Sequence, residues 1–418
     1  MRVLQTRMRS LVCVAALSVA IVGGSAIVAD AGGISIAPEI SQRLTEPQLA
    51  TYRYYLTSRA DFERQQQVYW KLIEERREFR RTKYAKQQPF AITDYVLEQP
   101  PKYTGPSLPP DIGAILDSVA KANPPAEPDK PMPALADFLD QARNIFGFVP
   151  DRTSEHEFKR RYAAEALASG LSKDQVVRVY ALETGGRGTY DMQAGIDPDS
   201  KQGRPISSAM GYAQLLSANS TDELVHHGEY FIQRLEQKPS AAARAKASIL
   251  REMLRAARKV PNEWKAHQAF AQTPQGQGIH AINLDADIGP ILQAIKLKGL
   301  LETAAKEAGR TNLTGAELEL MNLAGPRTGL EMMQLVGRTV PTANFFAESG
   351  YYRNSVVREK IGLQLLAAIE ERMQSGLTKP GAIDFALAFD EVASGLPARV
   401  AREAAPQPFG VGLFDPGR

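Results

Sequence analysis

Helix-forming signals recur along this chain with little interruption, and they constrain its fold more than any other feature. Between residues 134 and 375 amphipathic segments follow one another, several of them opened by Ser or Thr with Gln or Glu three residues later. In such a capping box the two side chains satisfy backbone N–H groups at the start of a helix. Alternating runs of β-branched residues, which predict strands, are scarce. The sequence therefore predicts a mainly α-helical protein.

The first thirty-one residues have the pattern of a cleavable signal peptide. Three arginines precede an apolar stretch over residues 11–28, and Ala29-Asp30-Ala31 supplies the small-x-small pattern read by signal peptidase. An uncleaved membrane anchor is the alternative, because the stretch approaches the length that spans a bilayer. The glycines inside the stretch favour cleavage. We therefore expect a periplasmic or secreted protein with no stable membrane span after processing.

The mature chain that cleavage would leave is almost neutral and has no cysteine. The whole sequence has 50 basic and 47 acidic residues, and without residues 1–31 the counts become 47 and 46. The only cysteine, Cys13, lies in the removed segment, so disulfides and thiolate metal sites are excluded. No cluster of surplus positive charge indicates a nucleic-acid partner. The histidines lack metal-ligand spacing, so neither a metal nor another cofactor is expected.

The chain divides into four expected parts. These are a signal peptide at 1–31, an accessory region at 32–134, a helical domain at 135–375, and a C-terminal helix and tail at 376–418.

The accessory region is expected to be helical and rich in proline. A long amphipathic helix is predicted from Thr45 to about Lys83, with Pro47 near its first turn. Repeated prolines after that helix cannot lie inside a helix, but a short helix is predicted over residues 112–122. The long charged helix is the expected contact for a protein of an envelope complex.

The predicted helix that ends at Glu183 carries the main functional signal. Ser172 and Gln175 form its capping box, and glycines follow its end. Glu183 shares the apolar face at helical spacing with Val176, Val179 and Tyr180. Burial would raise the pKa of this carboxyl, which a general acid needs near neutral pH. The alternative is a helix-terminal glutamate that turns out to water.

Further helices are predicted on both sides of a loop. Ser220 with Glu223, and Thr314 with Glu317, form capping boxes that open two of them. Helices are also predicted over residues 287–308 and 354–373, the latter entered by a loop at Ser349-Gly350. Residues 273–280 are expected to be a loop, either a functional lid or poorly ordered.

Three segments in this order resemble motifs of the soluble lytic transglycosylase family, whose core is helical and goose-lysozyme-like. That family has a helix ending in Glu-Ser-Gly, then a Gly-x-x-Gln segment, and later a helix ending in Tyr-Asn-Ala-Gly-Pro. The corresponding segments here are Ala181–Gly186, Ser207–Leu216 and Leu320–Pro326. The resemblance covers roughly residues 150–365, and it implies a lysozyme-like helical domain preceded by the accessory region.

By this resemblance Glu183 is the single acid/base of an enzyme that cleaves peptidoglycan glycan strands. It would act on the bond between N-acetylmuramic acid and N-acetylglucosamine, and the muramyl C6 hydroxyl would close on C1 to give anhydro-muropeptides. One carboxylate suffices where the N-acetyl group of the substrate stabilises the reacting centre. The residues expected to contact the substrate are Thr184, Gly211, Tyr212, Gln214, Asn322, Ala324, Gly325 and Tyr351.

Departures from the family pattern leave two alternatives open. Asn322 stands where the family has its tyrosine, so the chain could be an inactive peptidoglycan-binding or scaffold protein, unless Tyr351 or Tyr352 fills that space. A loop aspartate could instead act as a second carboxylate in a hydrolytic muramidase; the candidates are Asp191, Asp197 and Asp199. Glu348-Ser349-Gly350 also matches the first motif, but no Asn-Ala-Gly-Pro-like segment follows it, so Glu183 is preferred.

Overall fold

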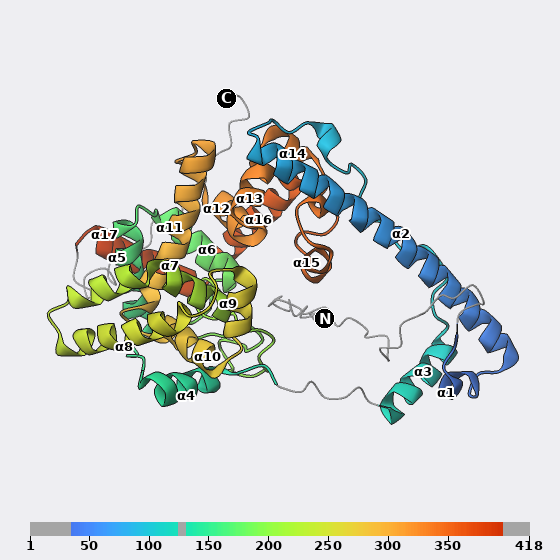
Figure 1. Cartoon of the computed structure of the whole chain (residues 1–418), viewed down its shortest axis with the longest axis horizontal. Helices are drawn as coiled ribbons and strands as arrows, with labels where there is room; N and C mark the ends of the chain where they lie inside the picture. Colours follow the sequence, from blue (N-terminus) through green and yellow to red (C-terminus); the bar gives the residue numbers. More distant parts are fainter. Residues whose placement is uncertain (1–34, 124–130, 396–418) are drawn as a thin grey trace, which may run out of the picture. The chain divides into compact units, whose positions relative to one another are not determined.

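The computed structural model describes residues 35–123 and 131–395 (Figure 1). Within these ranges the regular elements are α-helices and short 3-10 helices, and no β-strand occurs. This confirms the predicted all-α character. The predicted signal peptide and nearly all of the expected tail lie outside the described residues. No helix in the described ranges is both long and apolar enough to cross a membrane.

The described residues form two compact units. Unit 1 comprises residues 132–330 and 366–395, and unit 2 comprises residues 35–123, Pro131 and residues 331–365. The division near residue 132 agrees with the expected end of the accessory region. Residues 331–365 differ from expectation, because they pack with the accessory region and not with the helical domain.

Unit 2 is built on one long helix, α2, over Glu46–Ala85. The predicted start is confirmed, since the Thr45 backbone N–H donates to the Gln48 side chain at 2.9 Å. The apolar residues near this end pack as one cluster that contains Leu44, Leu49, Tyr52 and Ile112. The remaining elements of unit 2 are α1 Pro38–Ser41, η1 Ile92–Asp94, α3 Pro110–Ala122, α14 Leu335–Thr339, η3 Thr342–Asn344 and α15 Glu348–Arg353.

A buried arginine explains why residues 331–365 belong to unit 2. Arg80 of α2 is only 2% exposed, and its Nε donates to Glu331 at 2.7 Å. Its other nitrogens donate to the backbone carbonyls of Asp94 and Asn344 at 3.1 and 2.7 Å. The guanidinium also lies over the Tyr95 ring, 4.4 Å from the ring centroid. A buried charge is stable only when its donors are satisfied, so Arg80 ties three separate segments together.

In unit 1, α7 packs against α8, α10 against α4, α17 against α5, and α12 against α6 (Figure 1). Helices α4, α7, α8, α10 and α11 share one apolar core. The helices of unit 1 are α4 Leu135–Phe146, α5 Glu155–Ala168, α6 Lys173–Glu183, α7 Ser217–Glu236, α8 Ala241–Ala257, α9 Trp264–Phe270, α10 Pro274–His280, η2 Ala281–Leu284, α11 Gly289–Ala308, α12 Gly315–Ala324 and α17 Pro380–Ala393. Two more helices, α13 Pro326–Met333 and α16 Gly362–Leu377, have residues in both units.

Two predictions near α7 and α10 are wrong. Helix α7 begins at Ser217, and the Ser220 side chain does not cap it, because that hydroxyl is buried and pairs with Nδ1 of His280 at 2.8 Å. The expected loop at residues 273–280 is largely helix α10, capped by the Thr273 hydroxyl. Its Gly278 lies against the α4 backbone, where an added Cβ would come within 3.1 Å of the amide nitrogen of Ala142. The glycines therefore serve close helix packing.

The segment that precedes α16 also differs from prediction. Ser349 and Gly350 lie in the short helix α15, and α16 begins at Gly362, not at Asn354. Thr342 explains why α16 begins later than predicted. Its hydroxyl donates to the carbonyl of Val357 at 2.5 Å and holds the turn that precedes the helix.

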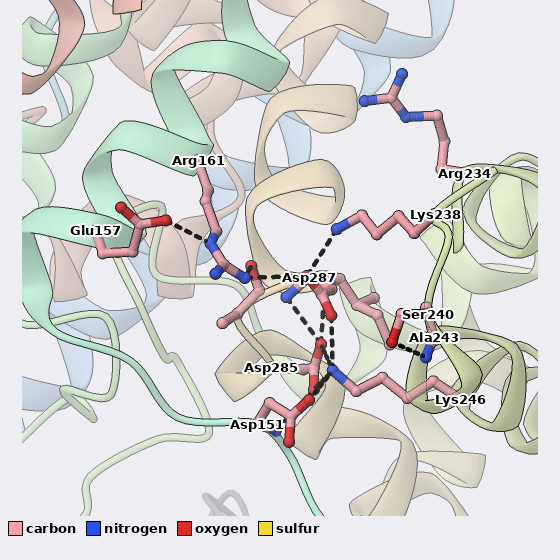
Figure 2. A network of polar contacts seen from close by, with 12 residues as sticks. Asp151, Glu157, Arg161, Arg234, Lys238, Ser240, Ala243, Lys246, Asp285 and Asp287 are labelled. Carbon is pink, nitrogen blue, oxygen red and sulfur yellow. Dashed lines mark hydrogen bonds and ion pairs between the residues drawn. The ribbon is translucent and has the colours of Figure 1, made fainter. Parts of the chain in front are cut away.

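A buried ionic network fixes the start of α11 (Figure 2). The Lys246 ammonium of α8 contacts the carboxylates of Asp151, Asp285 and Asp287 at 2.5, 2.9 and 2.8 Å. Asp285 also accepts the backbone N–H groups of Asp287 and Ile288 at 2.9 and 3.1 Å. The turn into α11 is thus held from several sides, which sets the position of the side chains that α11 carries.

Candidate functional site

The position of Glu183 follows from a helix whose start is firmly capped. The Gln175 backbone N–H donates to the Ser172 hydroxyl at 3.2 Å, and the Ser172 N–H donates to the Gln175 side chain at 2.9 Å. Val176 and Val179 are buried on the inward face of α6. Glu183 is the last residue of this helix and is half-buried. The capping box and the face predicted from sequence are therefore confirmed.

A second carboxyl group lies directly against Glu183. It belongs to Glu319 of α12, which is 2% exposed and is joined to Glu183 by a hydrogen bond between the two side chains. Two carboxylates cannot both ionise at this range without a large cost, so one of them retains a proton. Burial, with the neighbouring charge of Glu183, raises the pKa of Glu319 well above its ordinary value. Glu319 is therefore the neutral partner and donates to Glu183.

The balance of forces at Glu183 favours a protonated acid that can still ionise. Burial raises its pKa, while the positive charge of Lys296 and the hydrogen bond from Glu319 lower it. The two carboxyls titrate as a pair, in which Glu183 is the first to release its proton. A carboxyl whose pKa is raised, and whose ionised form has a hydrogen-bond donor and a positive charge nearby, suits general acid and base catalysis.

Asn322 binds both carboxyl groups. Its Nδ2 donates to Glu183 Oε1 at 3.2 Å, and contacts the two Glu319 oxygens at 3.4 and 3.3 Å. Asn322 follows Glu319 by three residues, which places both side chains on one face of α12. The predicted capping box of α12 is confirmed, since the Glu317 N–H donates to the Thr314 hydroxyl at 3.2 Å. The Asn322 amide therefore lies beside the Glu183 carboxyl.

Two further charged side chains complete the electrostatic setting. Lys296 of α11 exerts its positive charge on Glu183, Glu319 and Glu223. Glu223 of α7 is half-buried, and burial raises its pKa to about 7. The charge of Lys296 on α11 thus lowers the pKa of carboxyl groups on three other helices, α6, α7 and α12.

Two residues predicted to contact the substrate, Thr184 and Tyr212, are buried in the protein interior. The Thr184 hydroxyl is buried and donates to the Tyr180 carbonyl at 2.7 Å, within its own helix. Tyr212 is buried, donates its hydroxyl to Glu155 at 2.5 Å and meets Tyr180 edge to face. The expectation that Tyr212 contacts the substrate is therefore wrong, because its side chain belongs to the core.

Gly211 and Gln214 form a tight turn before α7. Gly211 has a left-handed φ of +77°, and an added Cβ would lie 2.9 Å from Nε2 of Gln293. Gln214 is half-buried and donates to the Gly211 carbonyl at 2.8 Å. The close neighbour of Gly211 is thus a buried side chain of α11. Gln214 has no hydrogen bond to Glu183 within the described ranges.

The last predicted contacts fall in two places. Ala324 and Gly325 are half-buried at the end of α12, two and three residues after Asn322. Tyr351 belongs to unit 2, where it is buried against Trp70 at a ring distance of 5.5 Å and accepts the Glu359 N–H at 2.8 Å. Its hydroxyl is therefore engaged inside unit 2.

The loop aspartates that were considered as second carboxylates all have local partners. Asp191 binds Arg152 at 2.5 Å, and Asp199 binds Arg187 at 3.1 Å. Asp197 accepts the backbone N–H of Ser200 at 2.8 Å within its turn. The additional carboxyl group at Glu183 comes instead from Glu319, which the motif comparison did not select. A glutamate between the apolar residues Leu318 and Leu320, three positions before Asn322, is the signal that points to Glu319.

Comparison with protein-family models, with curated proteins and with solved structures finds no match in any of the three. Among the described residues no group of three or more His, Cys, Asp and Glu side chains is arranged to hold a metal ion.

Proposed function

We propose that this protein is an exported lytic transglycosylase that cleaves the glycan strands of peptidoglycan, with Glu183 as its acid/base. The observation that carries the proposal is the hydrogen-bonded pair of Glu183 and Glu319, with the Asn322 amide on both. The signal-like N-terminal pattern supports a periplasmic or secreted location. The capped helices and the three motifs support a lysozyme-like arrangement of unit 1.

In the first step Glu183 protonates the glycosidic oxygen between N-acetylmuramic acid and N-acetylglucosamine, and the bond from C1 to that oxygen breaks. The new Glu183 carboxylate is stabilised by three groups already in place, namely the Glu319 hydroxyl, the Asn322 amide and the Lys296 charge. Stabilising groups that need no rearrangement lower the barrier to forming that charge.

In the second step the muramyl C6 hydroxyl attacks C1, and its proton returns to Glu183. The ring closure yields an anhydro-muropeptide and restores the acid, so no water is consumed. Glu319 keeps its proton throughout and acts as a positioning residue, because it reaches the substrate only through Glu183.

A glycan-binding protein without activity is the second candidate. The contact of one Asn322 amide with both carboxyls favours it, since a satisfied polar network can also be purely structural. In that case unit 1 would retain glycan strands without cutting them. In either case we propose that the long charged helix α2 recruits an envelope protein.

Digestion of purified sacculi, followed by mass spectrometry of the soluble products, tests the proposal. Wild-type protein should release anhydro-muropeptides, and Glu183→Gln should release at least about a hundredfold less, as expected for loss of a general acid. The matched control is Glu252→Gln, because Glu252 is an exposed glutamate of α8. Binding of sacculi with no soluble product from folded wild-type protein would contradict catalysis and support the binding protein.

A further inference from the structure

A row of apolar side chains lies exposed along one face of α2. It consists of Val68, Leu72 and Phe79, which are 70%, 39% and 48% exposed. Their spacing of four and seven residues places them on one side of the helix, whereas Trp70 and Ile73 are buried on another. Single apolar residues are normal on a surface, but an apolar row along an exposed helix face is typical of packing against a partner.

This exposed row is part of a heptad pattern, the pattern of helices that pair as coiled coils. The seam positions of a heptad alternate by three and four residues. On α2 they are occupied by Asp61, Gln65, Val68, Leu72, Glu75 and Phe79. A surface hollow at one end of the seam is lined by Asp61, Arg64, Gln65 and Val68. Four residues at this spacing form the kind of hole into which a facing helix inserts one side chain. The face therefore fits another helix.

The charges beside the row are complementary to those of a second, antiparallel copy of α2. Lys71 and Glu78 lie on the same flank of the seam, directly before Leu72 and Phe79. Lys71 is exposed, and the Glu78 side chain is 67% exposed beside Arg81 of its own helix at 3.0 Å. In an antiparallel pair this flank faces itself, so that Lys71 of each copy meets Glu78 of the other. In the same register Phe79 lies level with Val68 of the second copy.

A parallel pair lacks this complementarity. There Lys71 would meet Arg76 of the second copy, which places like charges together on both sides of the seam. Glu78 would meet Lys83, which already binds Asp94 within its own unit at 2.6 Å. The charges therefore favour the antiparallel arrangement.

We propose that two copies of this protein associate through α2, with the helices antiparallel and the two exposed rows packed against each other. The second copy is then the envelope protein that α2 recruits. The pairing rests on the recruiting role proposed for α2 and is independent of the chemistry at Glu183. Only three apolar side chains of each copy contribute, so the contact is small, and the association should be weak and reversible.

Analytical ultracentrifugation of the full chain, at concentrations from about 1 to about 100 µM, tests the pairing. Wild-type protein should dimerise reversibly. Lys71→Glu should weaken the dimer at least about tenfold, because like charges then face each other twice. Glu78→Lys should do the same, but a mixture of these two variants should pair as tightly as wild type, since their charges are again opposite. Arg53→Glu makes the same charge change as Lys71→Glu on exposed α2 surface outside the paired stretch and should have no effect.

Three results would overturn the pairing. One is wild-type protein that stays monomeric at every concentration, and another is Lys71→Glu that dimerises as tightly as wild type or more tightly. The third is an equal loss in Arg53→Glu, which would mean that net charge alone controls association. None of them bears on the digestion of sacculi by wild type and Glu183→Gln, so the proposed activity is tested separately.

Discussion

At the scale of single residues, the site depends on a proton that two glutamates share. Burial favours the neutral form of both, and their mutual hydrogen bond assigns the more firmly held proton to Glu319. Glu183 could be selected from the sequence because it ends a capped helix on the apolar face. Glu319 could not, because its role depends on α12 packing against α6, which a local pattern does not reveal.

The shared proton predicts how stability changes with pH. Because the fold raises the pKa of both glutamates, the folded state holds protons that the unfolded chain releases above its ordinary glutamate pKa near 4.5. Stability must therefore fall as pH rises through this window. Glu319→Gln removes one such proton, so it should be more stable than wild type at pH 8, by roughly 1 kcal/mol or about 2–4 °C in melting temperature.

Thermal unfolding followed by circular dichroism at pH 4 and pH 8 checks this prediction. The gain should disappear at pH 4, where the unfolded chain also retains most of its carboxyl protons. Glu252→Gln should show no pH-dependent difference. A Glu319→Gln variant that is less stable than wild type at pH 8 would mean that Glu319 is ionised in the fold.

At the scale of elements, the helices of unit 1 are predictable where their own residues cap them and unpredictable where tertiary contacts decide. Helices α6 and α12 begin where Ser172 and Thr314 predict. Helix α7 does not begin at its apparent capping box, because Ser220 is buried against His280. The start of the long helix α11 depends on Lys246, which lies far from Asp151, Asp285 and Asp287 in the sequence and binds all three.

Lys246→Met should destabilise unit 1 strongly. The change leaves Asp285 buried without its cation, and breaking a buried ion pair from one side typically costs about 3–5 kcal/mol. Lys298→Met is the comparison, since Lys298 pairs on the surface of α11 with exposed Glu302 and should change stability by less than about 0.5 kcal/mol. Urea denaturation of both variants measures the difference. Equal effects would show that the buried network has no special weight.

At the scale of the whole molecule, the two units are assembled from interleaved stretches of chain. Composition indicated the boundary near residue 132, because prolines and polar residues collect there. Nothing local indicates that residues 331–365 belong with the accessory region. That assignment follows from Arg80. It binds Glu331 and Asn344, which lie more than 250 positions away from it in the sequence, as well as nearby Asp94.

Arg80→Met should therefore loosen unit 2 and leave unit 1 unaffected. The carbonyls of Asp94 and Asn344 lose their buried donor, a change that costs about 1–3 kcal/mol for each unsatisfied group. Hydrogen exchange followed by mass spectrometry should show faster exchange in residues 90–96 and 331–346 but not in α7 or α8. Equal acceleration in both units would contradict the division.

The most direct test of the account compares the rates at which wild type, Glu183→Gln and Glu319→Gln release anhydro-muropeptides from sacculi. If Glu183 transfers the proton and Glu319 only positions it, Glu183→Gln should lose at least about a hundredfold, and Glu319→Gln, which keeps a hydrogen-bond donor, should lose less than about tenfold. A Glu183→Gln variant as fast as wild type would contradict the central claim.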